Sequence, residues 1–179
     1  RGRVTALLSL ARSGLVAEDS ARDEAASHAS TGQACMSSHD YANAITAYDA
    51  AVSLDVNDSA LTAKYQSCVD TARSSLSDAV SSARSKLEAG QSYVSSRDWE
   101  SAIESFRAGL AVDGVADESL MSSLRGGLES AESSKRDGEA AVSDARSLLS
   151  EGEAALASQS YTEAISSLES ALSLDVQND

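Results

Sequence analysis

Small and apolar residues recur at helical spacing through the middle of the chain. Their steps of four, three and four residues run through Leu61, Tyr65, Cys68, Ala72, Leu76, Ala79, Ala83, Leu87, Gly90 and Val94. This 11-residue repeat, about 3.67 residues per turn, keeps one face of a nearly straight α-helix apolar. The chain contains no proline, so the pattern predicts a single helix from Asp58 to about Ser96.

The same pattern predicts two further long helices. Four positions match the start of this face at an offset of 57 residues, namely Val4, Leu8, Ala11 and Leu15, which predicts a helix over residues 1–38. Later in the chain the offset changes from 59, at Leu120, Leu124 and Ala131, to 62, at Ala145 and Leu149. We therefore expect a three-residue insertion and a break within Glu132–Gly138, helped by the flexible Gly126–Gly127 pair.

Three copies of one segment alternate with the long helices. They read GQACMSSHDYANAITAYDAAVSLDVND, GQSYVSSRDWESAIESFRAGLAVDGVAD and GEAALASQSYTEAISSLESALSLDVQND. Each predicts the end of a long helix, a turn and a short helix, with the short helices at about 40–54, 98–112 and 160–174. Their expected N-caps are Asp40, Asp98 and Ser160. The spacing divides the chain into three units, residues 1–57, 58–116 and 117–179.

The copies agree where helix packing requires it. Each has a glycine, an aromatic residue nine positions later, an Ala-Ile pair and then a large apolar residue. These are Gly32, Tyr41, Ala44, Ile45 and Tyr48; Gly90, Trp99, Ala102, Ile103 and Phe106; and Gly152, Tyr161, Ala164, Ile165 and Leu168. Because Tyr41, Trp99 and Tyr161 hold the same place at each turn, we expect them to be wedges between helices.

This pattern resembles the tetratricopeptide repeat (TPR) family, which places a small residue on a first helix, an aromatic at the turn, and small and large apolar residues on a second. The resemblance implies an all-α fold, a TPR-like α-solenoid of long and short antiparallel helices, elongated and built from the three units. The period near 60 residues differs from the 34 of the family, because the long helices add about 25 residues to each unit. The proline that usually follows the second helix is replaced by Val56, Gly114 and Val176.

Cys35 and Cys68 are the only cysteines, and both fall on predicted apolar faces. They fit two small buried thiols. They also fit a disulfide between neighbouring helices, which would imply an oxidising compartment. A metal site of His28, Cys35 and His39 is a third reading, but His39 falls at a predicted turn, where a solvated side chain is expected instead.

Asn57 begins an Asn-Asp-Ser sequence, which fits an N-glycosylation acceptor in an exposed junction. Together with the two cysteines, it keeps an extracellular or cell-surface location open beside a cytoplasmic one. A calcium site in the acidic junction Asp55–Asp58 is a further reading, although the junction lacks the ligand spacing and the glycine of an EF-hand loop.

The charge and the motifs narrow the class of protein. The chain has 14 basic and 28 acidic residues, a net charge of −14, and its basic residues are scattered. Nucleic acid needs a positive stripe, and no apolar run reaches the ~18 residues of a membrane span, so we expect neither partner. No nucleophile elbow, phosphate loop or HExxH motif is present. We therefore predict a protein that is not an enzyme, with no catalytic residues, metal ligands or cofactor.

Two functions fit these expectations. The first is a structural or scaffold repeat protein, a segment or subunit of an extended array or filament that assembles end to end with further copies of itself. The pattern starts about where a long helix would begin and stops at Asp175–Asp179, just before the next one. No polar capping helix closes the last unit, as an isolated solenoid would need, so head-to-tail contact is expected.

The second is a TPR-type adaptor that binds a partner peptide in its helical groove. The version of the family that binds carboxylates uses Lys, Arg and Asn near the first-helix glycine. Here the residues that follow the glycines are Gln33, Gln91 and Glu153. The resemblance therefore does not extend to that clamp.

Overall fold

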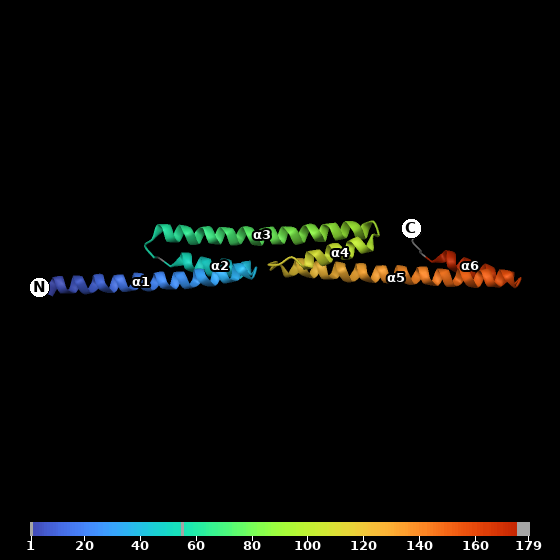
Figure 1. Cartoon of the computed structure of the whole chain (residues 1–179), viewed down its shortest axis with the longest axis horizontal. Coiled ribbons are helices and arrows are strands. Elements are labelled where there is room, and N and C mark those ends of the chain that lie inside the picture. The colour runs from blue at the N-terminus through green and yellow to red at the C-terminus, as the bar shows by residue number, and fades with distance from the viewer. Residues whose placement is uncertain (1, 55, 175–179) are drawn as a thin grey trace. The chain divides into compact units, whose positions relative to one another are not determined.

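The computed structural model describes residues 2–54 and 56–174, which form six α-helices and no strand, so the all-α prediction is confirmed. Long and short helices alternate as α1 (Gly2–Ser37), α2 (Tyr41–Ser53), α3 (Ser59–Ser95), α4 (Trp99–Leu110), α5 (Glu118–Ala157) and α6 (Tyr161–Ser173) (Figure 1). Asp55, in the acidic junction, and residues 175–179, the end of the last copy, lie outside the described residues.

The predicted helix boundaries agree with these elements to within about two residues. All ten positions of the predicted apolar face of α3 are buried or half-buried. Burial of this face provides most of the stability of such a helix, because a long helix with a Ser- and Ala-rich surface is marginal alone. Sequence periodicity therefore predicts both the extent of the helices and the face that packs.

The predicted break within Glu132–Gly138 is wrong. Helix α5 runs without interruption for 40 residues, three more than the 37 of α3, so the inserted residues are helical. Glu, Lys and Arg are good helix formers, and Gly costs only about 1 kcal/mol in a helix interior. Nothing in this segment forces the backbone out of the helix. Three added residues turn the packing face by about 60° instead, since 3.6 residues make one turn.

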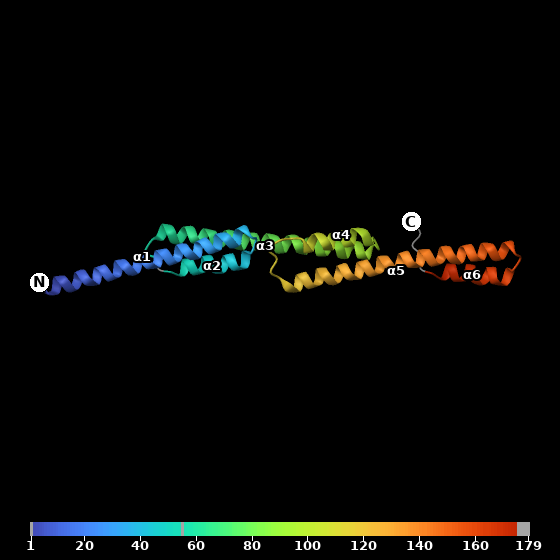
Figure 2. The ribbon, with the colours of Figure 1, turned by 60° about the horizontal axis from the view of Figure 1, so that its bottom comes forward.

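By compactness, the chain divides into Arg1–Arg84 with Ala111–Leu120, and Ser85–Leu110 with Met121–Asp179. In the first unit, the second half of α1, α2 and the first half of α3 pack together around Ala25, Ala51, Val56 and Tyr65. In the second, α4 lies beside the first half of α5 and α6 lies beside its second half (Figures 1 and 2). The three units of the sequence period remain a prediction.

Each turn from a long helix into a short one has the same backbone. The second residue after the long helix has a positive φ, 58° at His39, 59° at Arg97 and 61° at Gln159. The next N–H reaches back to a carbonyl five residues earlier, as from Asp40 to Cys35 at 2.8 Å. This is a Schellman motif, which usually has glycine at the left-handed position. Three different side chains hold the conformation here, so the sequence carries no local signal for it.

Aspartates cap four of the six helices. Asp40 accepts a hydrogen bond from the Asn43 N–H at 3.3 Å, and Asp98 accepts one from Ser101 at 3.1 Å. Two further caps, not predicted as such, begin the long helices: Asp58 accepts from Leu61 and Asp117 from Leu120, both at 3.0 Å. Ser160 is the N-cap residue of α6, as predicted, but its side chain makes no capping hydrogen bond. Asp58 of the acidic junction is thus engaged at a helix N-terminus.

The cap at Asp98 predicts an acid-sensitive contribution to stability. Hydrogen bonds from the Ser101 side chain and backbone hold the pKa of the Asp98 carboxyl below its usual value. A lowered folded-state pKa gives stability that is full above the ordinary Asp pKa of about 3.9 and is lost as the pH falls through the folded value. Asn caps nearly as well but carries no charge. We expect Asp98→Asn to be less stable than wild type at pH 6 and equally stable at pH 2.5, by urea unfolding followed by circular dichroism.

A matched control is Asp78→Asn, an exposed carboxylate in the middle of α3, which reports the general effect of removing one negative charge. Asp98→Asn and the control are compared by their free energies of unfolding at both pH values. If the difference between the two variants is the same at pH 6 and pH 2.5, the charged cap is not the cause.

Candidate functional site

The residues that the copies share meet where a short helix packs against long ones, and we call each such place a seam. In the first seam, Tyr48 of α2 is 3% exposed and lies directly on Gly32 of α1, where an added Cβ would meet the ring at 2.8 Å. On its other side Tyr48 shares a buried cluster with Ala44, Val69 and Ala72. The Tyr48 ring therefore joins α1 to α3, and its burial raises the pKa of Tyr48.

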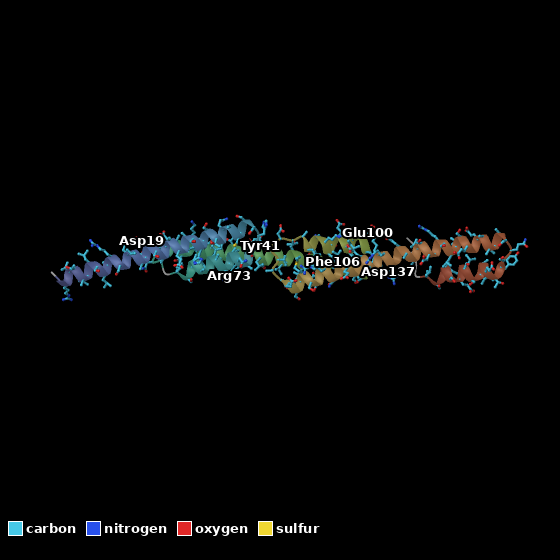
Figure 3. The ribbon with its side chains drawn as sticks, turned by 90° about the horizontal axis from the view of Figure 1, so that it is seen from below. Asp19, Tyr41, Arg73, Glu100, Phe106 and Asp137 are labelled. Carbon is cyan, nitrogen blue, oxygen red and sulfur yellow. The ribbon has the colours of Figure 1, made fainter. Side chains whose placement is uncertain are left out.

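The second seam repeats this arrangement with a different side chain. Phe106 of α4, labelled in Figure 3, is 1% exposed. A Cβ on Gly90 of α3 would lie 2.4 Å from its ring, and one on Gly127 of α5 would lie 2.7 Å from it. The ring is held between two glycines on successive long helices. Gly127 stands 59 residues after Cys68, so the two seams use equivalent positions.

The third seam is half built in the described residues. Leu168 of α6 lies on Gly152 of α5, where an added Cβ would meet it at 2.8 Å, and Ala164 is buried beside it. Leu168 itself is only half-buried, while Ile165 is 56% exposed. No later long helix exists among the described residues to cover them. Helix α6 thus packs on one long helix, where α2 and α4 pack between two.

The other positions that the copies share are covered in the first two seams and more exposed in the third. The alanines Ala44, Ala102 and Ala164 are all buried, Ile45 and Ile103 are half-buried, and Tyr41 and Trp99 are half-buried. Tyr41 packs on Gly114 of the α4–α5 connection, where an added Cβ would meet the ring at 2.4 Å and φ is 78°. The predicted wedge role is wrong for Tyr161, which is 61% exposed, since no described residue packs over it.

An equivalent ion pair ties the short helix to the following long helix in each complete seam. Arg73 of α3 reaches Asp49 at 3.2 Å, and Arg107 reaches Glu132 of α5 at 2.6 Å. Asp49 and Arg107 each follow the core aromatic residue, so the same two places hold the pair with the charges exchanged. These ion pairs could not be found by aligning the copies for shared residues. At each of the two positions one copy has an acidic residue and the other a basic one, so neither position shows a shared residue.

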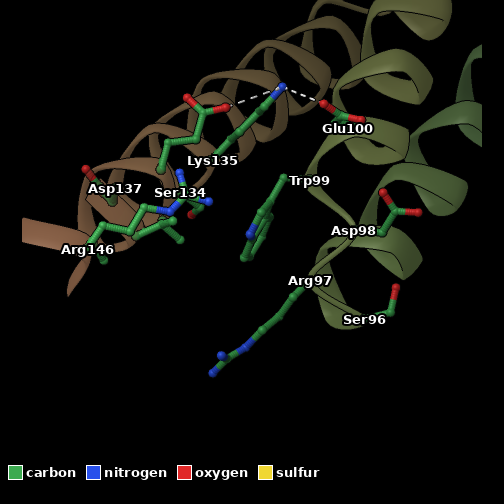
Figure 4. Close-up of a pocket in the computed structure, with 13 residues that line it drawn as sticks. Ser96, Arg97, Asp98, Trp99, Glu100, Ser134, Lys135, Asp137 and Arg146 are labelled. Carbon is green, nitrogen blue, oxygen red and sulfur yellow. Dashed lines mark hydrogen bonds and ion pairs between the residues drawn. The ribbon is translucent and has the colours of Figure 1, made fainter. Parts of the chain in front are cut away.

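A groove of about 1270 Å³ lies between the α3–α4 turn and α5, beside Trp99 (Figure 4). Lys135 crosses it to donate to Glu100 at 2.7 Å and lies 3.8 Å from Glu139. Glu100 accordingly raises the pKa of Lys135. Its walls carry both acidic and basic groups.

The structure also places the cysteines, histidines and asparagine that the sequence marked as candidate disulfide, metal and glycan sites. Cys35 and Cys68 are free, half-buried thiols that pack against the Tyr48 cluster. His28 lies 3.9 Å from Glu24, and His39 lies 3.8 Å from Asp113. Across residues 2–54 and 56–174, no group of three or more His, Cys, Asp or Glu side chains could hold a metal ion. Asn57 is exposed in the α2–α3 junction with a φ of 46°.

Comparisons with protein-family models, with curated proteins and with solved structures give no match to this chain. The TPR resemblance therefore rests on the repeated residues alone. None of the helices in the described part of the chain combines the length and the apolar character that crossing a membrane requires.

The close contact at Gly90 predicts a penalty for any larger residue there. Gly90→Ala forces Phe106 to move, and overpacking costs about 1–3 kcal/mol, which exceeds the gain of about 1 kcal/mol from helix propensity. Gly126→Ala is the matched control, since nothing lies within 4 Å of its added Cβ. We expect urea unfolding to show Gly90→Ala less stable than wild type and Gly126→Ala more stable. Equal shifts would mean that the Gly90 contact does not constrain packing.

The exchanged ion pairs predict a rescue by charge reversal. Arg107→Asp places two carboxylates side by side at the second seam and should lower stability, whereas adding Glu132→Arg recreates the charge order of the first seam and should restore it. A double-mutant cycle in urea unfolding should give a coupling of about 0.2–1 kcal/mol that shrinks in high salt. No coupling at low salt would show that the pair does not link α4 to α5.

Proposed function

We propose that the chain is a structural repeat module, a TPR-like α-solenoid of three units that extends end to end by adding further copies of itself. It acts as a scaffold and not as an enzyme. The observation that supports this function is the repeated seam. A core aromatic residue, a glycine and an ion pair occur together at Tyr48 and again at Phe106, while the third core residue, Leu168, has a long helix on one side only.

In a repeat array with such seams, the stability grows with the number of units. Among the described residues, the large side chains that are fully buried are few, namely Phe106, Leu124, Val56 and Val69, and most of the other buried apolar residues are alanines. Helix therefore contacts helix through thin seams, and each added unit contributes one more seam to the free energy of folding. A protein built in this way gains stability and length together, which suits a scaffold.

The ends of such an array would otherwise expose apolar surface to water. Large apolar residues are exposed in the first half of α1 and along α6, including Leu10 at 69% and Leu172 at 86%. Apolar residues that gather on an exposed face mark interaction surfaces. Addition of a further copy would remove both faces from solvent.

A peptide-binding adaptor of the TPR type is the second candidate. The observation that favours it is the groove of about 1270 Å³ beside Trp99. Trp99 is the only tryptophan of the chain, so its fluorescence would report a peptide entering this groove. Saturable spectral change with a defined peptide, in a chain that stays monomeric, would favour the adaptor over the scaffold.

The scaffold proposal predicts self-association of the 179-residue chain. Sedimentation velocity over a hundredfold range of concentration should show species that grow from monomer through dimer to longer assemblies, because an open end-to-end contact does not stop at a fixed number of copies. Negative-stain microscopy of the same samples should show rods or fibres. A single monomeric species up to millimolar concentration would contradict the proposal.

A further inference from the structure

One face in the first half of α1 is apolar and uncovered. Val4, Leu8, Ala11 and Leu15 follow each other at three- and four-residue steps, and Leu7 lies four residues before Ala11, which places all five on one side of the helix. Every residue from Gly2 to Ala17 is exposed, and the four large side chains of this face are 50–62% exposed. In Figures 1 and 2 no helix of its own unit lies beside this half of α1. We call these five residues the α1 face.

The equivalent faces of the other two long helices are covered. On α3, Tyr65, Val69 and Ala72 are at most 6% exposed and pack with α2. On α5, Leu120, Leu124 and Ala131 are likewise buried, and Leu124 touches the Gly109 position of α4. Each of these faces is covered by the short helix that comes directly before it in the chain, α2 for α3 and α4 for α5. The α1 face therefore has the form of a surface that receives a short helix.

The repeat offset shows where the core residue of a short helix would meet α1. Phe106 packs between two glycines, and Tyr48 packs between Gly32 and the region of Cys68. In α1 the place of Cys68 falls at Ala11, at the offset of 57 residues, and Ala11 belongs to the α1 face. The core residue of α6 that lacks a second long helix is Leu168. Leu168 is therefore the side chain that would lie against Ala11.

The charges of α1 and α6 favour contact between these two helices, and disfavour contact of either helix with its own copy. From Gly2 to Ala17 the chain has two arginines, Arg3 and Arg12, and no acidic residue. From Ser147 to Leu174 it has four glutamates and no basic residue, at Glu151, Glu153, Glu163 and Glu169. In a chain of net charge −14, the basic segment and the acidic segment attract each other. Contact between two α1 faces or two α6 helices would instead place like charges together.

We propose that the α1 face of one copy docks on α6 of a second copy, so that Leu168 lies between Gly152 of its own chain and the Ala11 region of the second copy. The contact completes the third seam and is head to tail. This inference rests on the proposed function and names its interface. Each copy carries one α1 face and one α6, so the contact is heterologous and the assembly stays open.

Two variants, each blocked at one end, test the interface. Leu7→Glu places a charge on the α1 face, and Ile165→Lys places one on α6, at the position equivalent to Ile45, which packs on the Tyr48 cluster in the first seam. Both sites are more than half exposed in the single chain, so the fold is expected to survive, and circular dichroism checks it. Val16→Glu is the matched control, since Val16 is 68% exposed but lies off the α1 face.

We expect each blocked variant to associate with itself at least about tenfold more weakly than wild type, as loss of one buried Leu or Ile side chain implies, and Val16→Glu to associate like wild type. An equimolar mixture of the two variants should form a one-to-one dimer and nothing longer, because each supplies the end that the other lacks. Sedimentation velocity resolves these species.

The other outcomes separate the two proposals. Wild type that stays monomeric overturns the proposed function and the interface with it. Wild type that assembles, with blocked variants that assemble equally well or with a mixture that gives no dimer, overturns the interface alone. Dimers formed by Leu7→Glu by itself would show a contact of α6 with α6, which also contradicts the proposed pairing.

Discussion

The structure depends on one contact, the packing of a large side chain from a short helix onto a glycine of the preceding long helix. It occurs at Tyr48 on Gly32, at Phe106 on Gly90 and at Leu168 on Gly152, and in each case an added Cβ would lie within 2.8 Å of the partner. Glycine lets the helix axes approach closely enough for one ring to reach both neighbours. In a chain so poor in aromatic residues, 4% of the total, these few side chains join helices whose other buried residues are mostly alanine.

Periodicity predicted the features that depend on packing. The apolar face of α3 and the ends of all six helices follow from repeated spacing, because a helix that must bury one face can vary little there. Features set by the backbone alone were missed: His39, Arg97 and Gln159 adopt positive φ without glycine, and α5 absorbs three extra residues where a break was expected. The exposure of Tyr161 was missed for a different reason, since its position in the repeat does not reveal whether a neighbour covers it.

The groove at Trp99 and the seams are two candidate sites of function, and both are formed by the same helices. The groove is open and lined by both charges, and Lys135 in it is paired with Glu100. The seams are specific, since each combines a core side chain, a glycine and, in the two complete cases, an ion pair. We propose that the basic start of α1 and the acidic segment around α6 give the same specificity to a contact between copies. Assembly is therefore the function that the strongest interactions of the molecule support.

Electron cryo-microscopy of the assembled chain tests the central claim most directly, because it places the first half of α1 relative to α6 of the neighbouring copy. We predict that Leu168 is enclosed there between Gly152 of its own chain and the Ala11 region of the next, as Phe106 is enclosed between Gly90 and Gly127. An assembly in which the α1 face remains in solvent, or packs against a second α1, would contradict the account.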